Sequence, residues 1–252
     1  MEITEKKENR IMDNHNSDAM ELTMNLVRID STDPGAYEGE IGEFIFQYLK
    51  GLDVPVIKKE VLPGRFNVMA RLEGEEQAPA LVYICHMDTV TTGEGWTVSP
   101  FGAEVIKGRI YGRGACDMKS GLACALSAFT SMALKARDGQ KPKRTLVFIG
   151  TVDEEDFMRG AEAAIADGWV TKDCWVLDTE PTNGRIEVAH KGRTWFEITV
   201  KGITAHASTP WKGADAIAAM AELISFIRRR IASCPVHPDL GASTVTLSLI
   251  HI

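Results

Sequence analysis

The sequence has no long apolar run and no apolar leader segment. Its longest conspicuous uncharged stretch, between Lys119 and Lys135, contains fifteen residues, whereas a membrane-spanning helix needs about 20 mostly apolar residues. Residues 1–20 are polar and charged and lack the apolar core of a signal peptide. These two absences predict a cytoplasmic protein that has no membrane partner.

Basic residues are outnumbered, and closely spaced cysteines are missing. Lys and Arg number 28 against 35 Asp and Glu, which gives a formal net charge of −7, whereas a nucleic-acid binder normally presents a basic face. We therefore expect no nucleic-acid partner. The cysteines number five, and no two of them form a Cys-x-x-Cys pair. A disulfide framework and a thiolate zinc site are both disfavoured.

Apolar runs alternate with helical patterns through most of the chain. Three short, continuous apolar runs are typical of buried strands, and helical segments separate them. This order is typical of an α/β domain around a largely parallel sheet whose strands are covered on both faces. The predicted strands are residues 80–85, 145–151 and 174–177, and the helices between them are residues 120–135 and 160–167.

Further elements precede and follow this alternation. Helical spacing predicts two earlier helices, and the pattern changes near residue 190, where a second, two-layer α/β domain is expected to begin. The earlier helices are residues 17–28 and 40–50, and the later elements are a strand at 194–201, a helix at 214–230 and a strand at 243–250. We divide the chain into a flexible tail (1–12), a first domain (13–188) and a partial second domain (189–252).

Acidic residues and one histidine gather where the predicted parallel strands end. Ligands of such sheets bind beyond the carboxyl ends of the strands, so these side chains are expected at one edge. Asp117 joins them through a Gly-rich loop that leads into the 120–135 helix. The residues that follow the three strands are His86 and Asp88, then Glu154 and Glu155, then Asp178 and Glu180.

This grouping favours a metal site. Closely packed carboxylates repel one another unless a cation compensates them, and imidazole with carboxylate suits zinc first, with Mn²⁺ or Co²⁺ as alternatives. One nitrogen of His86 can bind metal while the carboxylate of Asp88 accepts a hydrogen bond from the other. On an extended chain Glu154 and Glu155 point opposite ways, so one can bind metal and the other act as a base. Each signal alone has an ordinary structural reading; their coincidence at successive strand ends favours the metal.

Five sequence motifs occur in a fixed order along the chain, and together they resemble those of a metallopeptidase family. The family includes acetylornithine deacetylase, succinyl-diaminopimelate desuccinylase, aminoacylase and carboxypeptidase G. The resemblance covers roughly residues 17–249. The motifs are His86-Met-Asp-Thr-Val90, Gly112-Arg-Gly-Ala-Cys-Asp-Met-Lys119, Asp153-Glu-Glu155, Glu180-Pro-Thr182 and Gly202-Ile-Thr-Ala-His206.

The resemblance implies a fold and a metal set. The fold is a mostly parallel-sheet, zinc-exopeptidase-like catalytic domain over 13–188, with an incomplete two-layer α/β lid, or dimerisation domain, over 189–252. The metals are two Zn²⁺ ions bridged by Asp117 and a water. His86 and Glu180 would complete one metal, with Asp178 as the fallback for Glu180, and Glu155 would bind the other.

The resemblance also implies a reaction. Family members hydrolyse the amide bond of an N-acyl amino acid or a small peptide, often as homodimers joined through the lid. Glu154 would be the general base that takes a proton from the bridging water and passes it to the leaving nitrogen. Asp88 would orient His86, and His206 would stabilise the tetrahedral oxyanion.

The chain departs from the family in two places. After Glu155 the family usually has a small Gly-Ser-like turn, whereas residues 156–158 here are Asp-Phe-Met. The family's last metal ligand is a histidine far along a longer chain, and neither His237 nor His251 matches it. We therefore expect a C-terminally truncated member; the alternative is a catalytically inactive metal-binding or dimerising fragment. A metal-dependent phosphoesterase is disfavoured because no Arg/Lys cluster accompanies the acids.

Overall fold

A computed structural model describes residues 18–247. Contacts between Cα atoms divide the chain into two compact units, Met1–Pro181 and Thr182–Ile252, and each is described by itself. The expected tail (1–12) and His251 lie outside the described residues. None of the helices in the described part is both long and apolar enough to cross a membrane.

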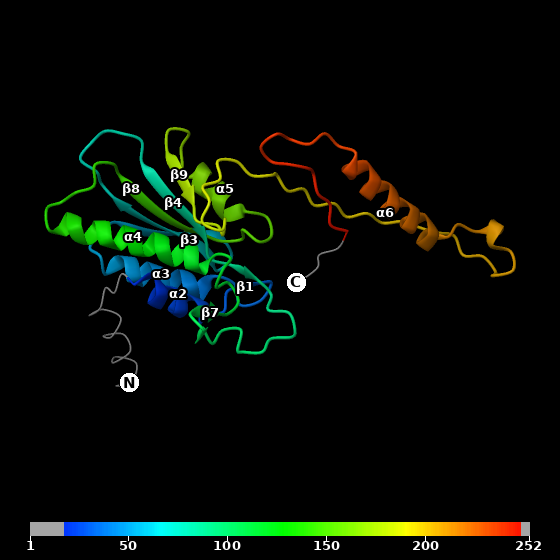
Figure 1. The fold of residues 1–252 in the computed structure, drawn as a ribbon, viewed down its shortest axis with the longest axis horizontal. Coiled ribbons are helices and arrows are strands. Elements are labelled where there is room, and N and C mark those ends of the chain that lie inside the picture. The colour runs from blue at the N-terminus through cyan, green and yellow to red at the C-terminus, as the bar shows by residue number, and fades with distance from the viewer. Residues whose placement is uncertain (1–17, 248–252) are drawn as a thin grey trace. The chain divides into compact units, whose positions relative to one another are not determined.

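The first unit is built around a five-stranded sheet of order β2-β3-β8-β4-β9 (Figure 1). β4 pairs in parallel with β8 and with β9, while β3 is antiparallel to β8 and to β2. The expected α/β class is confirmed; the sheet is mixed, and its parallel part is β8-β4-β9. The strands are β2 (Val56–Leu62), β3 (Arg65–Leu72), β4 (Leu81–His86), β8 (Leu146–Thr151) and β9 (Trp175–Asp178).

The hairpin of β2 and β3 was not among the predicted elements. Its turn is Pro63-Gly64, a dipeptide that signals turns, and Gly64 has φ +73°. β2 carries exposed charged side chains on one edge of the sheet, so its apolar pattern is weak. The hairpin brings Arg65 and Asn67 of β3 beside the segment that follows β8.

Helices cover both faces of the sheet, which explains why β4 and β8 are apolar without interruption. Alternate residues of β8 belong to two separate clusters: Phe148 packs in the large core with α2, α3 and α4, whereas Ile149 packs with Ala164 of α5. Figure 1 shows α2, α3 and α4 together along one face. The helices are α2 (Ala19–Val27), α3 (Gly39–Lys50), α4 (Lys119–Arg137) and α5 (Arg159–Ala166).

Two pairs of short strands complete the first unit. β1 (Thr32–Asp33) runs parallel to β5 (Thr89–Val90), and β6 (Glu104–Ile106) forms a hairpin with β7 (Arg109–Tyr111). The β1–β5 pair joins the loop after α2 to the segment that follows β4.

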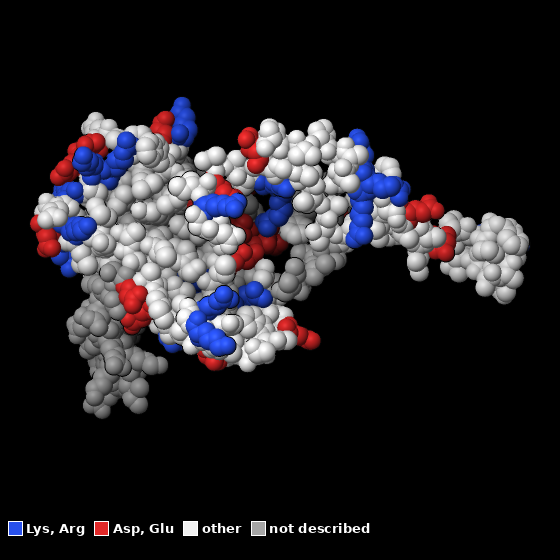
Figure 2. All heavy atoms as spheres, viewed as in Figure 1, with Lys and Arg blue, Asp and Glu red and all other residues white. Residues whose placement is uncertain are grey.

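On the face drawn in Figure 2, basic side chains stand in several separate groups interspersed with acidic ones.

The predicted burial of the strand at residues 174–177 is wrong. β9 does form, but all four of its residues are exposed, and Trp175 is 60% exposed. The strand is the last in the sheet order and pairs only with β4. An apolar run alone does not distinguish a central strand from an edge strand.

The second unit contains α6 (Ala216–Ala232) and a 3₁₀ turn, Pro210–Lys212. Asp215 caps α6, because its Oδ1 accepts from the backbone N–H of Ile217 and Ala218. The prediction of a strand at 194–201 is wrong, since these residues form none. A half-buried strand needs a paired neighbour and a packed face, and Phe196 is 82% exposed. Of the strand expected at 243–250, residues 243–247 form none and the rest lie outside the described residues.

Candidate metal centre

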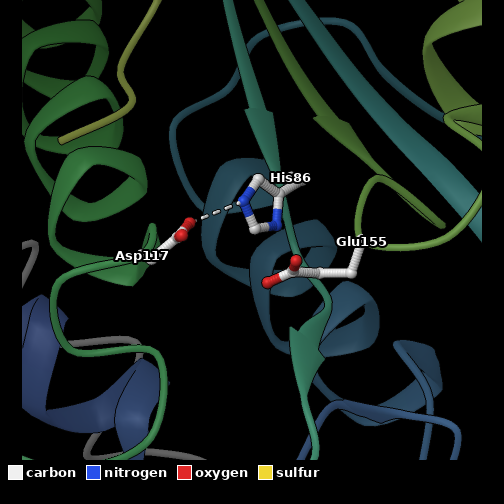
Figure 3. A group of neighbouring side chains, drawn as sticks. All are labelled: His86, Asp117 and Glu155. Carbon is white, nitrogen blue, oxygen red and sulfur yellow. Dashed lines mark hydrogen bonds and ion pairs between the residues drawn. The ribbon is translucent and has the colours of Figure 1, made fainter. Parts of the chain in front are cut away.

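His86 is the last residue of β4 and is buried at the carboxyl edge of the sheet. Asp117 reaches it from the loop before α4, and Glu155 from the loop between β8 and α5. Figure 3 shows the carboxylates of Asp117 and Glu155 turned toward the imidazole of His86. We expected successive strand ends to bring these groups together. They do so because β4, which carries His86, lies between β8 and β9 in the sheet.

The two ring nitrogens of His86 face different partners. Nδ1 lies 3.0 Å from the backbone oxygen of Asp88, which accepts a hydrogen bond from that nitrogen. Nε2 lies 3.1 Å from Asp117 Oδ1 and 3.3 Å from Glu180 Oε1. Burial lowers the pKa of His86, but hydrogen bonds to the surrounding carboxylates outweigh it and raise the pKa well above its ordinary value. Nε2 therefore sits where a positive charge is favoured.

Asp88 links the histidine to the loop that follows β8. Its carboxylate is fully buried, with Oδ1 3.6 Å from His86 Nδ1. Oδ1 also accepts from the backbone N–H of Glu154 at 3.2 Å, and Oδ2 accepts from that of Glu155 at 2.9 Å. Burial raises the pKa of Asp88, but His86 and the two N–H groups outweigh it and hold the pKa low. The link from Asp88 to the loop that follows β8 was not predicted from the sequence.

Glu154 and Glu155 lie in a turn, so the expectation of opposite directions on an extended chain is wrong. The segment follows Asp153, whose φ is +66°, and both glutamates belong to the turn. Possible ligand atoms of His86, Asp117 and Glu155 lie within 4.8 Å of one another, and so do those of His86, Glu154 and Glu180. Burial raises the pKa of Glu155 to about 7 despite the opposing effect of His86.

The donor set fits a divalent metal ion. Zinc bonds of about 2.0–2.1 Å in a tetrahedral site place neighbouring ligand atoms about 3.3 Å apart, and Nε2 of His86 is 3.1 and 3.3 Å from its two carboxylate neighbours. One imidazole faces several carboxylates, so the group carries an excess of negative charge. Burial is the main cause of the raised pKa of Glu155, and the neighbouring charges of Asp117, Asp88 and Glu154 add to it. A cation would relieve the excess of negative charge.

The segment that carries Glu180 is held against α4 by a close backbone approach. A Cβ on Gly121 would lie 2.0 Å from the carbonyl oxygen of Thr179, so only glycine fits there. Thr179 Oγ1 also lies 3.2 Å from Sγ of Cys85. The fallback residue, Asp178, is instead the last residue of β9, in register with Ile84. Gly121, in the first turn of the predicted helix, is the sequence feature that could have indicated this contact.

A second group of charged side chains lies beside this centre and was missed by the sequence analysis. Arg65 Nη2 donates to Asp33 at 2.6 Å and to Glu38 at 2.5 Å, and its Nε donates to the other oxygen of Glu38 at 2.6 Å. Asp153 accepts from Arg159 through both oxygens, at 2.5 and 2.6 Å. We call these five residues the arginine-paired cluster. The cluster joins three segments that are distant in the sequence (residues 33–38, residue 65 and residues 153–159), so no local motif indicates it.

The model of the peptidase family M20/M25/M40 matches residues 82–243 of this chain. The chain belongs to this family. The predicted resemblance is thereby confirmed. The match covers the segments that supply His86, Asp117, Glu155 and Glu180.

Individual relatives extend the comparison. A protein named as a probable succinyl-diaminopimelate desuccinylase, from Staphylococcus aureus, is 32% identical over 82% of this chain and 52% of its own length. An acetylornithine deacetylase from Vibrio campbellii is 33% identical over 89% of this chain and 59% of its own. This M20-family chain thus spans between half and three fifths of the length of these relatives.

Solved structures give the same family. A tripeptidase from Staphylococcus aureus aligns with a TM-score of 0.58 at 25% identity, over 83% of this chain and 56% of its own. An aminopeptidase from Bacillus cereus aligns with a TM-score of 0.56 at 25% identity, over 88% of this chain and 57% of its own. The fold of the first unit is therefore that of M20 peptidases.

His206 belongs to the second unit. Its side chain is exposed, and its Nδ1 accepts from the backbone N–H of Ser208 at 3.2 Å and lies 2.8 Å from the hydroxyl of the same residue. The local turn thus holds Nδ1 of the ring. Its role as an oxyanion stabiliser stays a prediction.

Proposed function

We infer that this M20-family chain hydrolyses the amide bond of an N-acyl amino acid or a small peptide with the help of divalent metal ions. The observation that carries this function is the convergence of one imidazole and several carboxylates on Nε2 of His86. The substrate class is supported by the names of the relatives, which are a desuccinylase, a deacetylase and peptidases.

The ligand assignment follows the distances. Asp117 lies beside both His86 and Glu155, which supports its role as the ligand shared by two metal ions. His86 and Glu180 then complete one ion, and Glu155 binds the other. Nitrogen and carboxylate ligands without thiolate favour Zn²⁺, with Co²⁺ or Mn²⁺ as substitutes. Asp88 orients His86 by accepting from Nδ1.

Glu154 is the residue that we assign to proton transfer. Bound metal ions supply Lewis-acid polarisation of the scissile carbonyl and lower the pKa of water. The Glu154 carboxylate takes a proton from the attacking water and returns it to the leaving nitrogen. Its backbone N–H donates to the carboxylate of Asp88, whose backbone oxygen accepts from His86, so one residue positions both the base and the histidine.

The test is Glu154→Gln with Glu162→Gln as the matched control. Glu162 is an exposed glutamate in the first turn of α5. Loss of a general base lowers turnover by about 10²–10⁴-fold, and zinc is retained because no ligand is removed. Turnover is measured on N-succinyl amino acids, N-acetyl amino acids and tripeptides, and bound zinc by elemental analysis.

Unchanged turnover in Glu154→Gln contradicts the base assignment. A wild-type chain that binds zinc but hydrolyses none of the three substrate classes supports the alternative of an inactive metal-binding fragment. The predictions about the second unit, namely the lid, homodimerisation and a catalytic His206, are tested separately by the oligomeric state and by His206→Ala.

A further inference from the structure

We propose that Arg65 and Glu38 are positioning residues for the glutamate loop, residues 152–158, which presents Glu154 and Glu155. This inference rests on the proposed function, which places those two side chains at the reacting centre. Neither Arg65 nor Glu38 touches the metal ligands in the structure; they act through the backbone of the loop.

Three consecutive backbone N–H groups of the loop donate to two buried carboxylates. The N–H of Asp153 donates to Glu38 Oε1 at 2.9 Å, and the N–H groups of Glu154 and Glu155 donate to the two oxygens of Asp88 at 3.2 and 2.9 Å. Successive N–H groups that point at anions fix a turn. The direction of the two glutamate side chains thus depends on both carboxylates.

Each of the two carboxylates has its own cation. Asp88 faces His86, whereas Glu38 is held by the fork of Arg65, which donates to both of its oxygens. Glu38 and Asp88 repel each other, and burial raises the pKa of Glu38 against the effect of Arg65. Arg65 therefore keeps Glu38 in the form that accepts from the loop. A lysine at this position would keep the charge but lose the bidentate geometry.

The far side of the loop is fixed by the same cluster. Arg159 at the start of α5 binds both oxygens of Asp153, and Nη2 of Arg65 lies 3.5 Å from Asp153 Oδ1. Asn67 of β3 completes the frame, since it accepts from the N–H of Val152 at 3.1 Å and donates to the carbonyl of Gly160 at 2.7 Å. The anchors on β3 explain why the unpredicted hairpin matters to the centre.

The test compares three substitutions in one strand. Arg65→Gln removes the charge, Arg65→Lys keeps it, and Arg71→Gln is the matched control, because Arg71 lies in β3 but pairs with exposed Glu73. Hydrogen exchange of the amides of residues 153–155 is measured in the 252-residue chain with a chelator present. Exchange at α4 in the same samples reports global unfolding.

We expect the exchange of residues 153–155, relative to α4, to be unchanged in Arg71→Gln. It should be at least about 10-fold faster in Arg65→Lys and faster still in Arg65→Gln, since each lost bond to a charged acceptor corresponds to about 1.5–3 kcal/mol. Turnover should fall in the same order, by about 10²-fold for a displacement near 1 Å. The KM should change little, because the substrate is not contacted by Arg65.

Unchanged relative exchange in Arg65→Lys overturns the inference, whatever the activity. If Arg65→Gln does not fold, Arg65→Lys decides alone. Faster exchange in a chain that neither binds zinc nor hydrolyses amides upholds the positioning and rejects the proposed function. Full activity in the wild type and in Arg65→Lys, with equal exchange, rejects the positioning and leaves the proposed function standing.

Discussion

Two groups of acids lie side by side in the first unit, and the chain compensates them differently. In the arginine-paired cluster, Asp33, Glu38 and Asp153 share the guanidinium groups of Arg65 and Arg159. At the candidate metal centre, the carboxylates face a single imidazole. Asp33, Glu38 and Asp88 also have oxygens within 4.8 Å of one another. Proximity of acids alone therefore does not identify a metal site.

The difference lies in where the positive charge comes from. Buried carboxylates need a compensating charge, because desolvation of an unpaired ion is unfavourable by several kcal/mol. Arg65 supplies it with a fixed fork, so Asp33 and Glu38 have a structural role. The acids around His86 are left with negative charge in excess, and three of them add to the effect of burial that raises the pKa of Glu155. We propose that a metal ion compensates this charge.

The largest effect should come from removing the internal cation. Arg65→Met leaves Glu38 and Asp33 without the cation that pairs them and should lower the free energy of unfolding by roughly 3–5 kcal/mol. Arg71→Gln, which breaks an exposed pair in the same strand, should lower it by less than about 1 kcal/mol. Urea denaturation with a chelator present measures both. Equal losses in the two variants would show that the arginine-paired cluster does not stabilise the fold.

A smaller effect should appear in the pH dependence of the metal-free chain. The pKa of Glu155 is raised in the folded state from 4.5 to about 7, so the folded state holds the proton more tightly. The stability that this gives is complete below pH 4.5 and is lost as pH rises through 7. The loss should be on the order of 1–2 kcal/mol once partial exposure is discounted.

Thermal unfolding between pH 4.5 and 7 tests this expectation in Glu155→Gln, with Glu162→Gln as control. With a chelator, the decline should vanish in the first variant and persist in the second. With zinc, the wild type should gain stability over the same range, because metal binds the deprotonated carboxylate. If stability declined equally in both variants, the decline would have to come from groups other than Glu155.

Sequence patterns predicted the parts of the fold that burial on both faces determines. Uninterrupted apolar runs fit only a covered strand or helix, so the sequence predicted β4, β8 and α4. The exposure of β9 could not be predicted, because an edge strand can carry the same apolar run as a central strand. The 194–201 strand failed because alternation predicts a strand only where a partner is available.

The candidate site divides in the same way. His86, Asp117 and Glu180 were found because each follows a recognisable strand or precedes a helix. Arg65 and Glu38 were missed because they are 27 residues apart and their pairing depends on the β2–β3 hairpin. Charge compensation is a property of the packed structure, and a single sequence does not display it.

The most direct test of the central claim is tightly bound zinc per folded chain, by elemental analysis after zinc loading and desalting. The wild type is compared with Asp117→Asn, which removes one charge from a half-exposed ligand without touching the arginine-paired cluster. The account predicts zinc in the wild type and its loss in Asp117→Asn. A wild type that retains no zinc, or equal retention in the two proteins, would contradict it.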